Sequence, residues 1–162
     1  MDTIKVKIAD LAVLKGAGFL ITVGLGSCVG IAIYDEKTKV AGLAHILLSD
    51  SEHFKKKKHQ EINLAKFADT AIPELIKRMQ ELGGRKPAMV AKIAGGSQLF
   101  NTDSHVMRVG QKNIEMVRKK LNSNSIPLVA EDVGGNYGRT MKLEVATGKV
   151  IITTVGRDEK IL

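Results

Sequence analysis

The segment CVGIAIYDEKTKVAGLAHILL, residues 28–48, carries the clearest structural pattern of the chain. Two apolar runs rich in β-branched residues, 29–34 and 40–48, flank the polar stretch DEKTK. β-branched residues favour strands, and a short polar stretch between two such runs is typical of a hairpin turn. The segment therefore predicts a β-hairpin that begins directly after Cys28.

Side chains alternate in size along this predicted hairpin. With the tip between Glu36 and Lys37, Cys28 lies directly opposite His45. Larger residues then share one face and small residues the other: Val29, Ile31, Ile33 and Val40 on the first, and Cys28, Gly30, Ala32 and Ala41 on the second. We expect the first face to be buried and the second to let another backbone or a substrate approach Cys28. This pairing depends on the register, because a slip of one residue moves His45 to the other face.

A cysteine beside a histidine is a candidate for nucleophilic catalysis. A free thiol has a pKa of about 8.5, so an imidazole that accepts its proton raises the fraction of reactive thiolate. The glycine-containing turn before Cys28 can present amide groups to an oxyanion, with Gly26 and Ser27 as the candidates. Thr22, at the end of the preceding predicted strand, is a candidate to orient the imidazole. The same spacing also fits two ordinary core residues, so the pair alone does not establish an active site.

Two other kinds of site, a dinucleotide-binding turn and a metal site, are alternatives for this sequence. Gly24-x-Gly26 after a strand resembles a dinucleotide-binding turn, but Gly30 comes one residue too late and a strand follows in place of a helix. Acidic and histidine side chains crowd the loop after the hairpin: Asp50, Glu52, His53 and His59. Their spacing fits no standard metal site, and His105 stands apart, so we expect no metal site.

The rest of the chain adds strands and two helices. Alternating or β-branched stretches predict strands at residues 4–8, 18–23, 89–94 and 128–133, and a closing hairpin at 141–155 with its turn near 147–148. Apolar residues at helical spacing predict one helix over 62–82, with a candidate kink at Pro73 and a stop at Gly83-Gly84, and another around 114–121. Roughly six or seven strands and two helices indicate a single α/β domain over residues 1–162, α+β-like in its order, because two helices are too few for an alternating βαβ array.

Composition narrows the class of protein. The chain has 162 residues, 44% hydrophobic and 26% charged, as in ordinary globular proteins. No secretory signal or membrane-spanning stretch is visible and there is one cysteine, so we expect a cytoplasmic protein without membrane insertion. The net charge of +8 and the cluster Lys55 to Lys58 raise the alternative of a nucleic-acid-binding domain. Tryptophan is absent and basic residues do not alternate with aromatic ones, so nucleic acid is not the expected partner.

Five motifs, in this order, resemble the CheD family of chemoreceptor glutamine deamidases: TVGLGSCVGIAIYD, GLAHILL, KFADTAIPELI, AKIAGGSQLF and IPLVAEDVGGNYGR. The resemblance covers residues 18–155 approximately. It implies a nucleophile at Cys28 in GLGSC, a base at His45 in GLAH and a third, polar member at Thr22. It also implies a layered β-sandwich flanked by helices, similar to the catalytic domain of cytotoxic necrotizing factor toxins.

The resemblance further implies a substrate and a partner. CheD-like proteins hydrolyse the carboxamide of particular glutamines on methyl-accepting chemotaxis receptors through a thioester on the cysteine, without a metal or organic cofactor. Some also hydrolyse glutamyl methyl esters, and CheD proteins pair with CheC, a phosphatase of the phosphorylated response regulator. We therefore expect a receptor-directed glutamine deamidase with a CheC-like phosphatase as second partner. A binding module that regulates such a phosphatase is the alternative.

Two further features concern the approach of the substrate. Family members often continue GLAH with Met-Leu-Pro, whereas this chain has the residues 46–49, ILLS, before its basic loop. That loop can attract acidic receptor helices. Glycine-rich turns let a substrate come close, so Gly95, Gly96 and the turn from Gly134 to Arg139 are candidates for the wall of the substrate groove.

Overall fold

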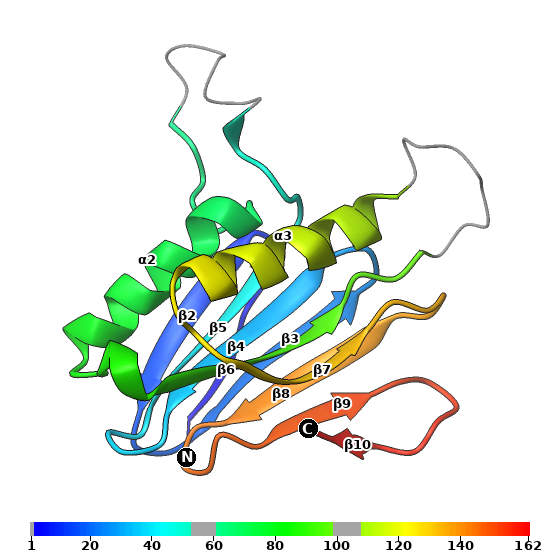
Figure 1. Cartoon of the computed structure of the whole chain (residues 1–162). Coiled ribbons are helices and arrows are strands. Elements are labelled where there is room, and N and C mark those ends of the chain that lie inside the picture. The colour runs from blue at the N-terminus through cyan, green and yellow to red at the C-terminus, as the bar shows by residue number, and fades with distance from the viewer. Residues whose placement is uncertain (1, 53–60, 99–107) are drawn as a thin grey trace.

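A computed structural model describes residues 2–52, 61–98 and 108–162. In this part of the chain two α-helices and two five-stranded sheets stack in three layers (Figure 1). The helices cover one face of the inner sheet, and the outer sheet packs against its other face. The predicted layered α/β fold, rich in strands and flanked by helices, is confirmed.

The inner sheet is built around the hairpin of residues 29–46. Its order is β2-β5-β4-β6-β7, in which only the β6 and β7 pair is parallel. The bounds are β2 (Asp10–Lys15), β4 (Val29–Asp35), β5 (Val40–Ile46), β6 (Met89–Gly95) and β7 (Leu128–Val133). The predicted hairpin therefore supplies two adjacent strands in the middle of this sheet.

The outer sheet has the order β1-β3-β8-β9-β10. β1 pairs with β3 in parallel, and the other neighbours are antiparallel. The bounds are β1 (Thr3–Lys5), β3 (Phe19–Leu25), β8 (Arg139–Glu144), β9 (Val150–Thr153) and β10 (Lys160–Ile161). The strands predicted near 18–23 and the closing hairpin are confirmed, whereas β2 and β10 were not predicted.

The two predicted helices are α2 (Ala68–Glu81) and α3 (Val109–Ser123), and a short 3-10 turn, η1 (Lys86–Ala88), precedes β6. α2 continues past Pro73 and ends at Glu81, and Gly83, two residues later, has a φ of 97° that stops the helix. It begins six residues later than its apolar spacing predicts (68 against 62), because the Asn63 side chain accepts a hydrogen bond from the Ala65 amide and forms a local turn there.

The alternation of size along the hairpin separates two cores. Val29, Ile31 and Ile33 pack toward the helices, whereas Cys28 and Ala32 face the outer sheet. The predicted division into two faces is confirmed, and the small side chains have a clear role. They let the outer sheet approach, so both faces of the hairpin are buried.

The predicted register of the hairpin was wrong by two positions. His45 lies opposite Gly30 rather than Cys28, because the strands separate at Asp35 and Val40 and the tip lies further along the chain. The Asp35 carboxylate accepts hydrogen bonds from the amides of Lys37 (2.9 Å) and Thr38 (3.3 Å), which fixes this longer turn. A shift of two keeps every side chain on its face, so Cys28 and His45 still face the same layer.

No helix in the described ranges is both long and apolar enough to cross a membrane.

We predict that Gly30→Ala destabilises the protein by about 1 to 3 kcal/mol, because the added methyl group would overpack the layer between the sheets. A Cβ at this position would lie 2.6 Å from Met141 Sδ and 3.1 Å from Leu25 Cδ1. Gly138→Ala is the control, since its nearest contact would be 3.9 Å from Leu25 O. Urea denaturation measures both variants, and equal stability of the two would contradict the packing described.

Candidate active site

Three candidate residues come from separate elements and face the layer between the two sheets. Thr22 lies on β3 of the outer sheet, His45 on β5 of the inner sheet, and Cys28 directly before β4. All three are buried, with exposed fractions of 1%, 0% and 6% respectively. The predicted trio is therefore gathered in one layer, although the register places Cys28 diagonally from His45 rather than opposite it.

Thr22 holds the imidazole of His45 across the layer. Thr22 Oγ1 lies 2.6 Å from His45 Nδ1 and 2.6 Å from the carbonyl oxygen of Val6. A hydroxyl has one hydrogen, which it donates to the Val6 carbonyl, so the imidazole must donate its Nδ1 hydrogen to Thr22. The neutral ring then carries a lone pair on Nε2, the atom available to accept a proton.

The second nitrogen of His45 has no partner. Nε2 is buried and makes no hydrogen bond among the described residues, to Cys28 Sγ or to any other atom. A buried polar atom without a partner costs about 1 to 3 kcal/mol, so such an atom calls for a functional explanation. A proton acceptor kept free in the layer that Cys28 also faces supplies one.

Burial keeps both reacting groups neutral. It raises the pKa of the Cys28 thiol above its ordinary value, although the backbone amide of Cys28 lowers it in part. Burial also lowers the pKa of His45 to about 4. At neutral pH the resting site therefore holds a thiol and a neutral imidazole rather than a thiolate and an imidazolium.

The turn before β4 is held by its carbonyl groups. The Gly26 carbonyl accepts hydrogen bonds from the amide (2.8 Å) and the hydroxyl (2.7 Å) of Ser97. Asn113 Nδ2 donates to the Ser27 carbonyl at 2.9 Å, and the Gly96 amide donates to the Cys28 carbonyl at 2.8 Å. Every carbonyl from 26 to 28 thus accepts a hydrogen bond, either from the segment after β6 or from α3.

Gly95 and Gly96 lie behind this turn. Both adopt positive φ, 107° and 66°, and a Cβ on Gly95 would lie 2.3 Å from the Cys28 carbonyl oxygen. A Cβ on Gly96 would lie 2.4 Å from Ile114 of α3. Both positions therefore require glycine, which lets the end of β6 approach the turn. Their predicted role in binding substrate stays a prediction.

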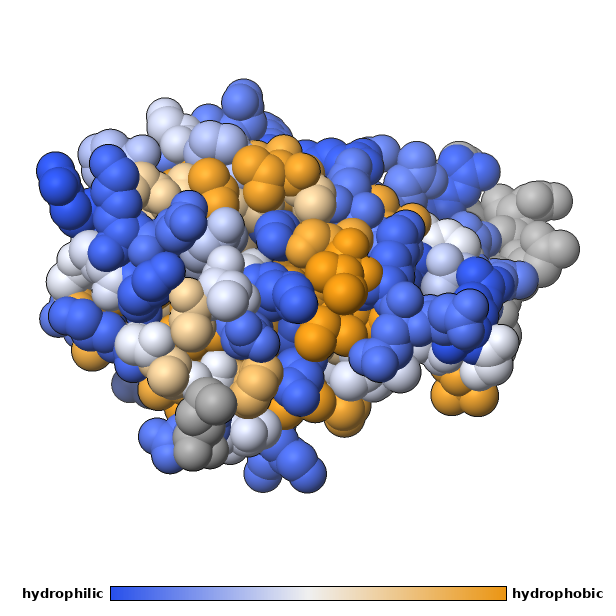
Figure 2. All heavy atoms as spheres, turned by 90° about the horizontal axis from the view of Figure 1, so that it is seen from below, coloured by the Kyte–Doolittle hydropathy of each residue, from blue (hydrophilic) through white to orange (hydrophobic). Residues whose placement is uncertain are grey.

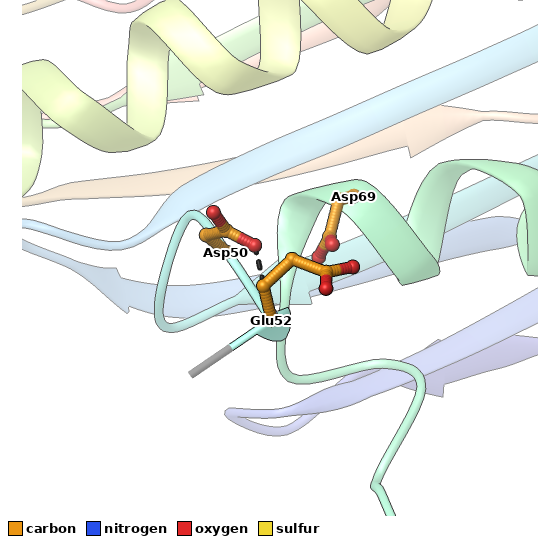
Figure 3. Close-up of side chains that lie close together, drawn as sticks. All are labelled: Asp50, Glu52 and Asp69. Carbon is orange, nitrogen blue, oxygen red and sulfur yellow. Dashed lines mark hydrogen bonds between the residues drawn. The ribbon is translucent and has the colours of Figure 1, made fainter. Parts of the chain in front are cut away.

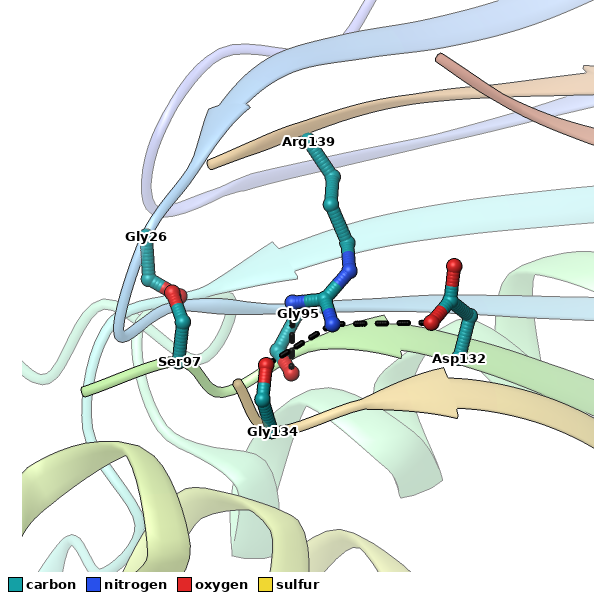
Figure 4. A network of polar contacts seen from close by, with 6 residues as sticks. All are labelled: Gly26, Gly95, Ser97, Asp132, Gly134 and Arg139. Carbon is teal, nitrogen blue, oxygen red and sulfur yellow. Dashed lines mark hydrogen bonds and ion pairs between the residues drawn. The ribbon is translucent and has the colours of Figure 1, made fainter. Parts of the chain in front are cut away.

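Arg139 is also buried rather than open to solvent, with 3% of its surface exposed. Its guanidinium donates to the carbonyls of Gly134 (2.7 Å) and Gly95 (3.4 Å) and lies 3.5 Å from the Asp132 carboxylate (Figure 4). Arg139 is the first residue of β8, so these contacts join the outer sheet to the ends of β6 and β7 in the inner sheet. Its predicted contact with substrate stays a prediction. Its hydrogen bonds indicate that it stabilises the end of the molecule where β6, β7 and β8 meet.

Sequence reasoning missed Ser97 and Asn113. Asn113 is fully buried on α3, and it falls among the apolar residues at helical spacing that predict this helix. A polar residue on the apolar face of a helix was the available signal, because such a residue needs a buried partner. Ser97 carried no comparable signal.

Acidic side chains gather near the start of α2 (Figure 3). Carboxylate oxygens of Asp50, Glu52 and Asp69 lie within 4.8 Å of one another. Asp69 already accepts hydrogen bonds from the amide and hydroxyl of Ser51, at 3.0 and 2.8 Å. The histidines weighed for a metal site, at 53, 59 and 105, and the lysines at 55–58 lie outside the described residues.

An apolar groove of about 540 Å³ lies on the other side of β3. Its lining includes Ile8, Ile21 and Val23, and it contains neither Cys28 nor His45. In the view from below, hydrophobic side chains gather near the middle of the visible face and hydrophilic ones surround them (Figure 2). The groove and the reacting groups are therefore separated by the strand that carries Thr22.

The arrangement of thiol, imidazole and hydroxyl has the parts of a cysteine hydrolase site: nucleophile, base and orienting group. The CheD family model, described as CheD chemotactic sensory transduction, matches residues 47–154. The chain is 50% identical over 162 residues to the "Probable chemoreceptor glutamine deamidase CheD" of Moorella thermoacetica, covering 98% of this chain and 95% of that protein. The protein of the same name from Clostridium botulinum strain Hall is 52% identical over 159 residues, 97% of this chain and 96% of that protein. The chain belongs to the CheD family.

We predict that the rate at which iodoacetamide alkylates Cys28 rises about tenfold per pH unit from about pH 7 to about pH 9, because only the thiolate reacts and burial raises the thiol's pKa. Cys28 is the only cysteine, so mass spectrometry of the intact protein follows the reaction, and Cys28→Ser is the unlabelled control. A rate that stays constant between about pH 5 and pH 8 would instead reveal a thiolate–imidazolium pair and contradict the neutral site.

Proposed function

We propose that this protein hydrolyses the carboxamide of glutamine side chains on chemoreceptors to carboxylate, with Cys28 as nucleophile and His45 as base. The observation that carries the proposal is the buried His45 ring, whose Nδ1 is fixed by Thr22 while its Nε2 is left unpaired in the layer that Cys28 faces. The substrate class rests on the relatives, whose name is chemoreceptor glutamine deamidase.

The chemistry begins when a bound carboxamide brings thiol and imidazole together. The Cys28 proton passes to His45 Nε2 while Sγ forms a bond to the amide carbon. The tetrahedral intermediate collapses, the carbon–nitrogen bond breaks, and the proton on Nε2 leaves with ammonia. Water then loses a proton to Nε2 and attacks the thioester, which releases glutamate and restores the thiol.

The amides of the turn stabilise the oxyanion in both steps. Ser97 holds the Gly26 carbonyl, so the Ser27 amide in the same peptide group points away from Ser97. Asn113 holds the Ser27 carbonyl, so the Cys28 amide points away from α3. The role predicted for Ser27 is retained in this proposal. Gly26 contributes through its carbonyl, and its own amide donates to Gly24 O at 3.0 Å.

Other parts of the prediction rest on the family resemblance alone. The thioester route also serves glutamyl methyl esters, because water attacks the same acyl group after methanol leaves. Binding to a CheC-like phosphatase and a cytoplasmic location stay predictions. So does the absence of nucleic acid among the partners.

Incubation with a receptor signalling fragment tests the proposal, with mass spectrometry to detect glutamine turned into glutamate. We expect no conversion by Cys28→Ala and a rate about 10²- to 10⁴-fold lower for His45→Ala. Thr22→Val removes the hydroxyl that orients the ring and lowers the rate at least about tenfold, whereas Thr22→Ser retains the hydroxyl and most of the activity.

Thermal unfolding of each variant serves as the control for folding. Conversion that persists in Cys28→Ala, or equal loss in Thr22→Val and Thr22→Ser, would refute the assigned roles.

A further inference from the structure

The Asn113 side chain joins the turn before Cys28 to the segment that follows His45. Its Nδ2 donates to the Ser27 carbonyl at 2.9 Å and to the Leu47 carbonyl at 3.1 Å. Both acceptors are carbonyl oxygens, so the amino group rather than the oxygen of the carboxamide must face them, and its two hydrogens suffice for both bonds. One buried amide therefore links the nucleophile's turn with the end of the strand that carries the base.

The position of Asn113 is fixed by the packing of α3. Asn113 is fully buried, and Gly110, one turn earlier, lies against the segment after β6. A Cβ on Gly110 would lie 2.5 Å from the Ser97 carbonyl oxygen and 2.6 Å from that of Gly96. This close approach brings the helix near enough for a short side chain to reach the turn.

The Ser27 carbonyl determines where the Cys28 amide points. The described chain has no cis peptide bond, and in a trans peptide the C=O and the following N–H point in opposite directions. With the Ser27 carbonyl held toward α3, the Cys28 N–H must point away from it.

We infer that Asn113 is a positioning residue, which aims the Cys28 amide at the oxyanion and holds the turn in register with the strand of His45. This inference rests on the proposed function and extends it to a residue that contacts neither substrate nor the reacting atoms. It also gives a reason to keep a polar side chain whose buried Oδ1 finds no hydrogen-bond partner among the residues that the structure describes.

The test replaces Asn113 with leucine, which keeps the branched shape and the number of heavy atoms but not the donors, and with serine, which keeps one donor. Val117→Ala is the matched control, since Val117 is fully buried on the same helix and contacts the apolar core. For Asn113→Leu we expect kcat on a receptor fragment to fall about 10- to 100-fold with KM within about threefold, because oxyanion stabilisation acts in the transition state. We expect the kcat of Asn113→Ser to lie between the kcat of Asn113→Leu and that of wild type.

Alkylation of Cys28 by iodoacetamide separates positioning from general damage. Displacement of iodide forms no oxyanion, so we expect the alkylation rate at fixed pH to stay within about twofold of wild type in Asn113→Leu. An unchanged kcat in Asn113→Leu would overturn the inference. So would a parallel fall of kcat and alkylation that Val117→Ala reproduces at equal loss of stability.

Hydrogen exchange tests the tether without any substrate. We expect amide exchange over residues 27–29 to be faster in Asn113→Leu than in Val117→Ala, because only the first loses the bond to the Ser27 carbonyl. Equal exchange in the two variants would overturn the inference. If wild type converts no receptor glutamine, the proposed function fails, and the exchange measurement still decides whether Asn113 holds the turn.

Discussion

The site depends on the hydrogen bond between Thr22 Oγ1 and His45 Nδ1, which runs from the outer sheet to the inner one. It forms only if the two sheets pack closely, and the small residues that face the outer sheet from β4 and β5 allow this. Gly30, opposite His45 in the register, leaves room for Met141 and Leu25 of the outer sheet. The fold and the tautomer of the imidazole are therefore set by the same contact.

The buried setting explains why the resting pair is neutral. Desolvation disfavours charge on both groups, raising the pKa of Cys28 and lowering that of His45 to about 4. A thiol kept neutral in this way is a weak nucleophile at neutral pH, because only the thiolate reacts readily. The unpaired Nε2 is unfavourable for folding but keeps a proton acceptor ready, and such local costs are expected at functional sites rather than elsewhere.

Periodicity predicted much of this structure because it is a local property. The alternation from Val29 to Ile33 and the helical spacing around Ile114 identified the central hairpin, its two faces and α3. The register was wrong because it depends on the side chain of Asp35, which binds two amides in the turn and moves the tip. β2 was not predicted, since Asp10–Lys15 shows neither clear alternation nor a turn signal of its own.

Only part of the site was predicted, because some of its contacts join residues far apart in the sequence. Cys28, His45 and Thr22 were found through motifs, whereas Asn113 and Ser97 contact the turn from distant parts of the chain. The sequence separation from Ser27 to Asn113 is 86, and no local pattern reports a contact of that kind. Arg139 was predicted to line the wall of the substrate groove, and its burial among backbone carbonyls follows only from the meeting of β6, β7 and β8.

Nitrogen-15 NMR of the His45 ring tests the central claim most directly. We expect a neutral ring with its hydrogen on Nδ1 and a bare Nε2 at neutral pH, unchanged until the pH approaches about 4. Thr22→Val should remove the preference for the hydrogen on Nδ1, because valine cannot accept a hydrogen bond from it. A ring that carries its hydrogen on Nε2, or that titrates near its ordinary value of about 6.5, would contradict the account.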